Sequence, residues 1–207
     1  MLDHGLKHQL SVYLNHLARP VALSASLDSS PASDALRRLL TEISLLSDKI
    51  HLVDAPAPAK RLPSFSISAV GHPARISVAG LPMGHAFSAL VLALLHVGGH
   101  PPKEAPALLD RAKQLNGALH FETYFVQDCQ SCPETLQALN LLATLNPNVS
   151  HVAIDGAQFP AEMEQRQVLK VPKVYLNGDY FCSGWMDFRQ ILDTLAPPCE
   201  RHLTHAP

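Results

Sequence analysis

The sequence predicts an α/β protein made of two similar units packed side by side, each with a central mixed sheet flanked by helices. Short runs of strand-forming residues alternate along the chain with runs whose apolar residues recur at helical spacing. The order strand, helix, strand, hairpin, helix occurs twice. A proline precedes each hairpin, in Leu62-Pro63-Ser64-Phe65 and in Val171-Pro172-Lys173-Val174. Together these observations predict that one arrangement is repeated along the chain.

The first unit is expected to span residues 1–100. Leu10, Leu14 and Leu17 recur near helical spacing and predict an amphipathic helix over residues 6–17. Residues 20–27 alternate like a strand, and Asp28-Ser29-Ser30-Pro31 then starts the next helix. The other expected elements are a helix at 35–46, strands at 50–53, 65–67 and 76–78, and an apolar helix at 85–97.

A connecting helix, residues 101–116, leads to a second unit at residues 117–197 and a tail at 198–207. We expect Pro102 near the first turn of the connecting helix and Asn116-Gly117 at its end. Asn177-Gly178 predicts a tight hairpin turn. The expected strands lie at 119–126, 149–154, 173–176 and 180–183, and the helices at 133–145, 161–168 and 188–195. A β-α-β unit followed by a hairpin and a helix is the thioredoxin-like arrangement, so the prediction is two tandem thioredoxin-like folds.

Composition and charge exclude several classes of function. The 207 residues include 16 Lys and Arg against 18 Asp and Glu, and this near-neutral balance argues against nucleic-acid binding. The longest apolar stretch, residues 87–99, is about half the ~20 residues needed to cross a bilayer. The N-terminus shows no basic region followed by an apolar one. We therefore expect a cytoplasmic protein without a membrane partner, in which a close cysteine pair indicates redox or metal chemistry.

Cys129-Gln130-Ser131-Cys132-Pro133 is the sharpest signal in the chain. It follows an expected strand and opens an expected helix, where free N–H groups and the helix dipole stabilise a thiolate. Two intervening residues let the second sulfur reach the first, so the pair can close a disulfide and reopen it. Cys129 is the expected exposed nucleophile, and Cys132 is the expected buried resolving thiol.

The same pair is also half of a structural zinc site. The other half would need Cys182, Cys199 or histidines, and neither cysteine lies in a second CxxC or beside an HxxxH pattern. The strand before the pair, the helix after it and the Val171-Pro172 loop favour redox chemistry. In a fold of this class, a proline at position 172 can be cis and present the backbone of Val171 to a disulfide partner.

The remaining candidate groups are expected to play no chemical role. Cys182 lies mid-strand among aromatic residues and is expected to be a buried, inert thiol, and Cys199 is expected to be exposed in the tail. Asp128 is expected to point to solvent. His96 and His100 are four apart, but two glycines interrupt the helix between them, so we expect no metal site there.

The first unit has no thiol where the pair would fall, so it is expected to be redox-inert and to act as a packing surface, docking platform or shield. No GxGxxG pattern follows a strand anywhere in the chain. The sequence therefore carries no dinucleotide fingerprint of its own.

Motifs from both units are shared with a known family. They are Phe121-Glu122-Thr123-Tyr124, Cys129-x-x-Cys132-Pro133, Gln137-Ala138-Leu139-Asn140-Leu141, Leu145-Asn146-Pro147, Ala153-Ile154-Asp155-Gly156, Val171-Pro172, Asn177-Gly178, Pro63-Ser64-Phe65, Gly84-His85, the apolar run at 88–95 and Gly98-Gly99-His100-Pro101. With these motifs the chain, from residue 1 to about 196, resembles the N-terminal domain of the alkyl hydroperoxide reductase F subunit, a flavoprotein that reduces a bacterial peroxiredoxin.

The resemblance implies that Cys129 and Cys132 pass electrons to the disulfide of the peroxiredoxin. It also implies that a second dithiol beside a flavin re-reduces them, with NADH as the source. FAD and NADH are therefore expected on a separate chain or on a domain not included in this sequence, so the chain is either a free-standing shuttle or part of the larger flavoprotein.

Three positions depart from the pattern of that family. Gln130-Ser131 stands where the family usually has His-Asn, and Ala86 stands where it has a glutamate. Both changes are expected to alter thiolate stability, potential or rate. A general protein disulfide reductase of thioredoxin or glutaredoxin type stays open as an alternative, as does a non-enzymatic zinc-binding or docking module.

Overall fold

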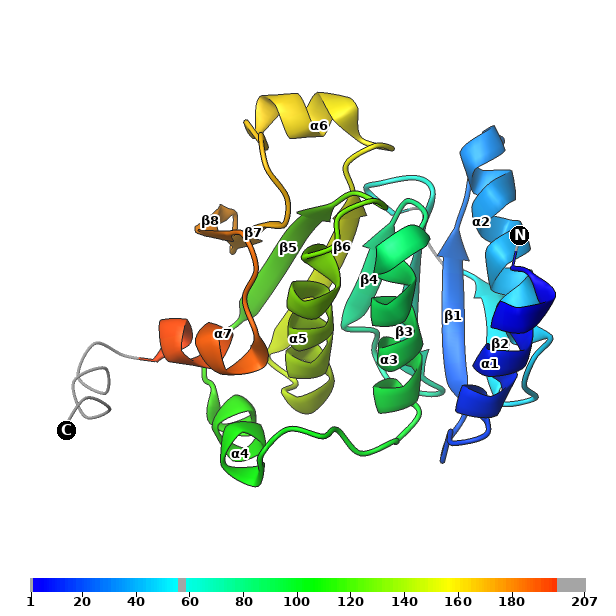
Figure 1. Cartoon of the computed structure of the whole chain (residues 1–207), viewed down its shortest axis with the longest axis horizontal. Coiled ribbons are helices and arrows are strands. Elements are labelled where there is room, and N and C mark those ends of the chain that lie inside the picture. The colour runs from blue at the N-terminus through cyan, green and yellow to red at the C-terminus, as the bar shows by residue number, and fades with distance from the viewer. Residues whose placement is uncertain (1, 56–58, 197–207) are drawn as a thin grey trace.

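A computed structural model describes residues 2–55 and 59–196, in which helices cover an eight-stranded sheet (Figure 1). The elements up to residue 97 are α1 (His4–Leu14), β1 (Val21–Ser26), α2 (Pro31–Ser44), β2 (Ile50–Asp54), β3 (Ser64–Ala69), β4 (Ile76–Ala79), the 3-10 turn η1 (Gly84–Ala86) and α3 (Phe87–Val97). The later elements are α4 (Pro106–Gln114), β5 (Leu119–Phe125), α5 (Cys132–Leu145), β6 (Val149–Asp155), α6 (Pro160–Gln165), β7 (Lys173–Leu176), β8 (Asp179–Ser183) and α7 (Phe188–Leu195).

Local chemistry explains where several elements start and turn. The Asp3 side chain caps α1 by accepting from Leu6 N, and Asp187 caps α7 in a reciprocal capping box with Gln190. Asn177 and Gly178 have φ values of 53° and 92°, which a two-residue hairpin turn between β7 and β8 requires. The hairpin expected from Asn177-Gly178 is confirmed.

The connecting helix begins later than expected. Helix α4 starts at Pro106, so the expectation that Pro102 lies near its first turn is wrong. Pro106 supplies the φ angle that a first helical residue needs, and it pushes Ala105 out of the helical region, to φ −60° and ψ 138°. Pro102 instead lies in an irregular segment four residues earlier.

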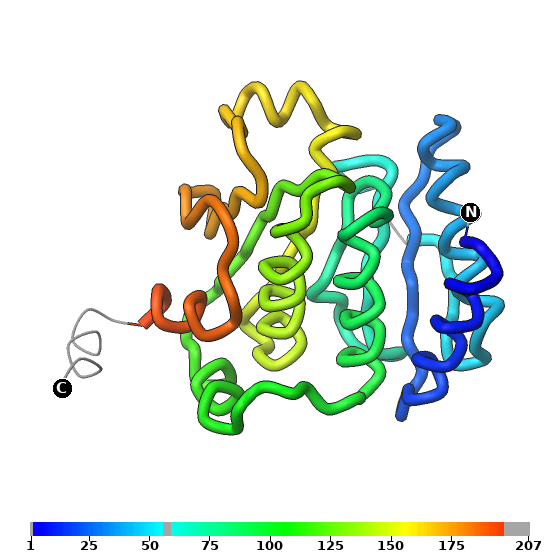
Figure 2. The backbone as a smooth tube through the Cα atoms, in the orientation of Figure 1, coloured from blue at the N-terminus to red at the C-terminus, as the bar shows by residue number. Residues whose placement is uncertain are grey.

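The strand order shows the same arrangement twice. The full order is β2-β1-β3-β4-β6-β5-β7-β8, so each unit places its second strand beside its first, followed by the hairpin. The predicted tandem thioredoxin-like fold is confirmed. The sequence did not indicate that β4 pairs in parallel with β6, from Ile76 opposite His151 to Ala79 opposite Ile154. The two units therefore share one continuous sheet (Figure 2).

Helices α1, α3, α5 and α7 lie in front of the sheet in the view of Figure 1. Helices α3 and α5, one from each unit, pack directly against each other. Leu94 of α3 and Leu139 of α5 are completely buried, and both belong to one hydrophobic cluster that runs through the two units. The dithiol helix α5 is therefore supported by the core of both units.

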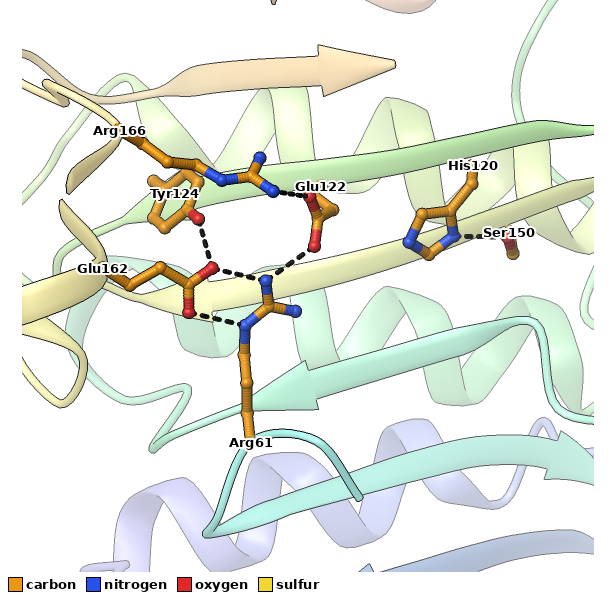
Figure 3. Close-up of polar contacts among 7 residues, drawn as sticks. All are labelled: Arg61, His120, Glu122, Tyr124, Ser150, Glu162 and Arg166. Carbon is orange, nitrogen blue, oxygen red and sulfur yellow. Dashed lines mark hydrogen bonds and ion pairs between the residues drawn. The ribbon is translucent and has the colours of Figure 1, made fainter. Parts of the chain in front are cut away.

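A buried ionic network joins the two units on the sheet face turned away from α5 (Figure 3). Arg61, from the segment before β3, donates to Glu122 on β5 at 2.6 Å and through Nε to Glu162 on α6 at 2.9 Å. Arg166 contacts the other oxygen of Glu122 at 2.8 Å, and the Tyr124 hydroxyl donates to Glu162. Arg61 and Glu122 are almost fully buried. If either side chain were removed, water could not solvate the charge of the other.

The network sets the ionisation of its carboxylates. Hydrogen bonding from Arg61 lowers the pKa of Glu162 from its ordinary value of 4.5 to about 2. Burial acts to raise the pKa of Glu122, but the hydrogen bond from Arg61 and the positive charges of Arg61 and Arg166 together more than offset it, and the pKa falls. Because both folded-state pKa values are depressed, the two carboxylates stabilise the fold above about pH 4.5, and the contribution of Glu162 is lost as the pH falls toward about 2.

We predict that Arg61→Met destabilises the protein by about 3–5 kcal/mol at neutral pH, because it leaves Glu122 and Glu162 facing each other without their shared cation. The loss of stability below pH 4.5 should also be shallower in this variant. Urea unfolding from pH 2.5 to 7 measures both effects. Arg37→Met is the matched control, since Arg37 makes an exposed 3.5 Å ion pair with Asp54 that contributes at most about 1 kcal/mol. Equal losses in the two variants would contradict the network's role.

We also predict that the described core unfolds in one transition. Leu94→Ala in the first unit should cost about 2–5 kcal/mol and lower the midpoint reported by Trp185, the chain's one tryptophan, which lies in the second unit. Trp185 fluorescence and far-UV circular dichroism should give the same midpoint. Val12→Ala, at a half-exposed position, should leave it nearly unchanged. An unmoved Trp185 transition in Leu94→Ala would show that the units unfold separately.

Candidate dithiol active site

Cys129 and Cys132 form a disulfide at the start of α5, with an S–S distance of 2.14 Å and a Cα–Cα distance of 5.5 Å. Cys132 is the first residue of the helix and Pro133 follows it. The missing N–H of Pro133 falls in the first turn, where backbone donors have no intrahelical partner anyway. The expected placement of the pair, after a strand and opening a helix, matches the structure.

The two sulfurs differ in access. Cys132 is completely buried, whereas Cys129 is only partly buried and is flanked by exposed residues at 128, 130 and 131. Asp128 points to solvent, as expected. An attacking group from outside can therefore reach the Cys129 sulfur more readily than the Cys132 sulfur.

The backbone of Val171 lies against the disulfide. The Val171–Pro172 peptide bond is cis, and Cys129 Sγ lies 3.8 Å from the Val171 carbonyl oxygen. Pro172 O accepts from Gly184 N at 2.8 Å, which holds the loop from its far side. The Leu62–Pro63 bond of the first unit is also cis, but no thiol accompanies it.

The segment after β8 supports the first turn of α5. The Trp185 indole N–H donates to the carboxylate of Glu134, and Met186 N donates to Thr135 Oγ1 at 3.0 Å. Thr135 Oγ1 in turn donates to Met186 O at 3.2 Å. These contacts were not expected, because Glu134 and Trp185 lie far apart in the sequence and neither belongs to a recognisable motif.

Gln127 was not singled out from the sequence, and Asp155 was noted there only as part of a shared motif, with no role at the site. Asp155 ends β6 and is completely buried beside the segment that follows β4, and burial raises its pKa against hydrogen bonds from Gln127 and Ala157 N. Gln127 Nε2 donates to Asp155 Oδ2 at 3.4 Å and to Leu81 O at 3.3 Å. This arrangement arises from the pairing of β4 with β6, which no local pattern indicates.

The three residues that depart from the resembled family lie between the two cysteines and in the turn η1. Ser131 Oγ lies 3.6 Å from Cys129 Sγ, and the Gln130 side chain is exposed. Ala86 is buried in η1, a turn that packs against α5. The structure places no carboxylate at position 86.

The structure describes Cys182, His96 and His100 among the other candidate groups. Cys182 is half-buried on β8, and burial raises the pKa of its thiol to about 11, which makes it a poor nucleophile. Cys199 and the expected tail at 198–207 lie outside the described residues. Burial lowers the pKa of His96, and the charge of the neighbouring His100 lowers it further. Within residues 2–55 and 59–196 no three His, Cys, Asp or Glu side chains are grouped so that they could hold a metal ion.

A search for membrane-spanning helices over the described part of the chain finds none long and apolar enough to cross a bilayer.

Comparison with known proteins agrees with this geometry. Residues 120–196 match the family model of a thioredoxin domain. The F subunit of the alkyl hydroperoxide reductase of Xanthomonas campestris pv. phaseoli is 50% identical over 195 residues, which are 94% of this chain and 37% of that protein. The chain thus spans little more than a third of the length of this curated relative.

Two solved structures share the fold. The NTD_N/C domain of the alkyl hydroperoxide reductase AhpF from Enterococcus faecalis superposes with a TM-score of 0.88 at 25% identity, covering 95% of this chain and 100% of that one. A protein disulfide oxidoreductase from Aeropyrum pernix has the same fold, with a TM-score of 0.80 at 20% identity, covering 99% of this chain and 97% of that one. In sequence and fold the chain corresponds to the tandem thioredoxin-like N-terminal domain of alkyl hydroperoxide reductase F subunits.

Proposed function

We propose that this chain is a dithiol–disulfide oxidoreductase that passes electrons to the disulfide of the peroxiredoxin component of alkyl hydroperoxide reductase, in peroxide detoxification. The observation that carries the proposal is the pair itself. One partly exposed and one buried cysteine at a helix start form a disulfide beside the Val171 carbonyl. The likeness to alkyl hydroperoxide reductase F subunits supplies the partner class.

The reaction needs only the atoms of the two disulfides. The Cys129 thiolate attacks one sulfur of the partner's disulfide, which forms a mixed disulfide and releases the partner's other sulfur as a thiolate. The Cys132 thiolate then attacks Cys129 Sγ, which closes the 129–132 disulfide and releases the second partner thiolate. Two electrons leave this chain, and the partner's two sulfurs are protonated. We assign Cys129 as nucleophile and Cys132 as resolving thiol.

Val171 and Pro172 are proposed to line the surface that receives the partner. The Val171 carbonyl lies 3.8 Å from Cys129 Sγ, so a segment bound across the loop would bring its disulfide to that sulfur. The working unit in this proposal is residues 117–197, joined by residues 101–116 to the redox-inert unit at 1–100.

The electrons must come from another group. The chain contains no glycine-rich dinucleotide loop after a strand, so its own residues do not suit FAD or NADH and no step here passes through them. We propose that a flavin-dependent disulfide reductase, on another chain or on a further domain, returns two electrons to the 129–132 disulfide. Such a cycle suits the reducing cytoplasm.

We predict that reduced Cys132→Ser traps the oxidised peroxiredoxin as a stable mixed disulfide through Cys129. Without the resolving thiol, the first step proceeds and the second does not. Non-reducing electrophoresis followed by peptide mass spectrometry should find Cys129 joined to a peroxiredoxin cysteine, and steady-state peroxide turnover should fall to background.

Cys182→Ser is the matched control and should trap nothing while keeping wild-type turnover. A reactive Cys129 that traps no peroxiredoxin but reduces insulin would replace the proposed partner with a general set of protein disulfides. Stoichiometric zinc bound by the purified protein, with no reducible disulfide, would exclude redox chemistry altogether.

A further inference from the structure

The dithiol loop, residues 126–131, carries Cys129 from the end of β5 to the start of α5. Its internal hydrogen bonds run from Cys129 N to Val126 O at 3.1 Å and from Cys132 N to Cys129 O at 3.4 Å. Residues 128, 130 and 131 are exposed, whereas Val126 and Gln127 are partly buried. Gln127 is therefore a place where neighbouring elements can hold the loop.

Residues 80–85, from the redox-inert unit, hold Gln127 by its backbone and by its side chain. His85 N donates to Gln127 O at 2.9 Å, a hydrogen bond of ordinary length. Gln127 Nε2 donates to Leu81 O at 3.3 Å and to Asp155 Oδ2 at 3.4 Å, both at the long end of the range. The loop that bears the nucleophile is thus tied to a unit that has no thiol at the matching position.

Gly84 brings the two segments together more closely than any other residue could. A Cβ at this position would lie 2.5 Å from Gln127 O and 3.1 Å from Gln127 C. Real Cβ atoms keep at least about 3.0 Å from such atoms, so a side chain here would have to displace the Gln127 carbonyl by roughly half an ångström. The displaced atom is backbone, and it lies two residues before Cys129.

The position of the loop determines how Cys129 reacts. Its sulfur lies at the start of α5, where free backbone N–H groups favour a thiolate, and 3.8 Å from the Val171 carbonyl oxygen. Both relations depend on distance and direction, and a misplacement of about 1 Å can cost on the order of 100-fold in rate. Contacts that hold Gln127 therefore act on Cys129 through the backbone.

We propose that residues 80–85 of the inert unit are a working part of the dithiol site, with Gly84 and Gln127 as positioning residues that set the reactivity of Cys129. The inert unit is then more than a docking platform or a shield, because it contributes the contact that holds the nucleophile's loop. This inference rests on the proposed dithiol chemistry, but it concerns the intrinsic reactivity of Cys129 and not the identity of the partner.

The decisive variants are Gly84→Ala and Gly71→Ala in the otherwise complete chain. Both glycines belong to the inert unit and have positive φ, +60° and +80°, but a Cβ at Gly71 would meet nothing within 4 Å. Gly71→Ala therefore carries the backbone cost of an alanine without the clash, and it is the matched control.

The measurements use small reagents, so no protein partner is needed. Iodoacetamide labelling of the reduced protein across pH, with peptide mass spectrometry to isolate Cys129, gives the labelling rate and its pH midpoint. The rate with a small aromatic disulfide gives reactivity toward S–S bonds. We expect Gly84→Ala to lower both rates about tenfold and to move the midpoint, and Gly71→Ala to match wild type.

A second pair of variants covers the case in which Gly84→Ala does not fold. Gln127→Leu removes the side-chain bonds to Leu81 and Asp155, and it should lower the labelling rate by about threefold, the effect of roughly one net hydrogen bond. Gln137→Leu is its control, because Gln137 also joins α5 to the inert unit, through Ser88 at 3.2 Å, but lies outside the loop.

Each outcome decides a different point. Identical rates and midpoints in Gly84→Ala and Gly71→Ala, beside a reactive wild type, overturn this inference and leave the proposed function standing. If Gly84→Ala does not fold, identical values for Gln127→Leu and Gln137→Leu do the same. A wild-type dithiol that reacts with no small disulfide overturns the proposed function and this inference with it.

Discussion

The parallel pairing of β4 with β6 is the contact on which the rest of the molecule depends. Edge strands present unpaired N–H and C=O groups, and this joint satisfies one edge of each unit's sheet at once, from Ile76 opposite His151 to Ala79 opposite Ile154. The pairing of β4 with β6 also fixes where the neighbouring segments of the chain lie. The chain leaving β4 reaches the dithiol loop, and the segment before β3 brings Arg61 to the charges on β5 and α6. Both cross-unit contacts follow from one shared register.

The two units share a topology but use the start of the first helix differently. In the inert unit, Ser33 Oγ donates to Asp28 at 2.6 Å and Ser30 Oγ caps α2 by accepting from Ser33 N. Hydrogen bonds made to Asp28, by Ser30 first and then by Ser33, lower the pKa of Asp28 to about 2. In the second unit, which carries the cysteine pair, no side chain caps α5. The inert unit thus uses its helix-start donors to stabilise a turn, whereas α5 leaves its donors available to the sulfurs.

Local signals in the sequence were enough to predict most helices and strands and the position of the cysteine pair, because each of these depends on neighbouring residues. The Asn177-Gly178 turn and the strand–CxxC–helix order are signals of this kind. The joint between the units was not predictable in this way, since it pairs strands separated by another whole strand and three helices. Arg61 and its partner Glu162 are 101 positions apart, and only the folded sheet brings them together. Pro102 shows that local signals can also be ambiguous. Two prolines four residues apart are equally suited to start a helix, and only Pro106 does so.

The unequal burial of the two sulfurs has a consequence for the order of events under the proposed function. Cys132 is completely buried in the disulfide form, so a reductant must attack Cys129 Sγ and release Cys132 as the leaving thiolate at the helix start. The oxidised partner must later meet the same Cys129 sulfur. Electron donor and electron acceptor therefore need the same few ångströms of surface beside Val171 and cannot occupy it together. Such a site works by alternation, and its kinetics should be ping-pong, with the donor and the acceptor each inhibiting competitively against the other at high concentration.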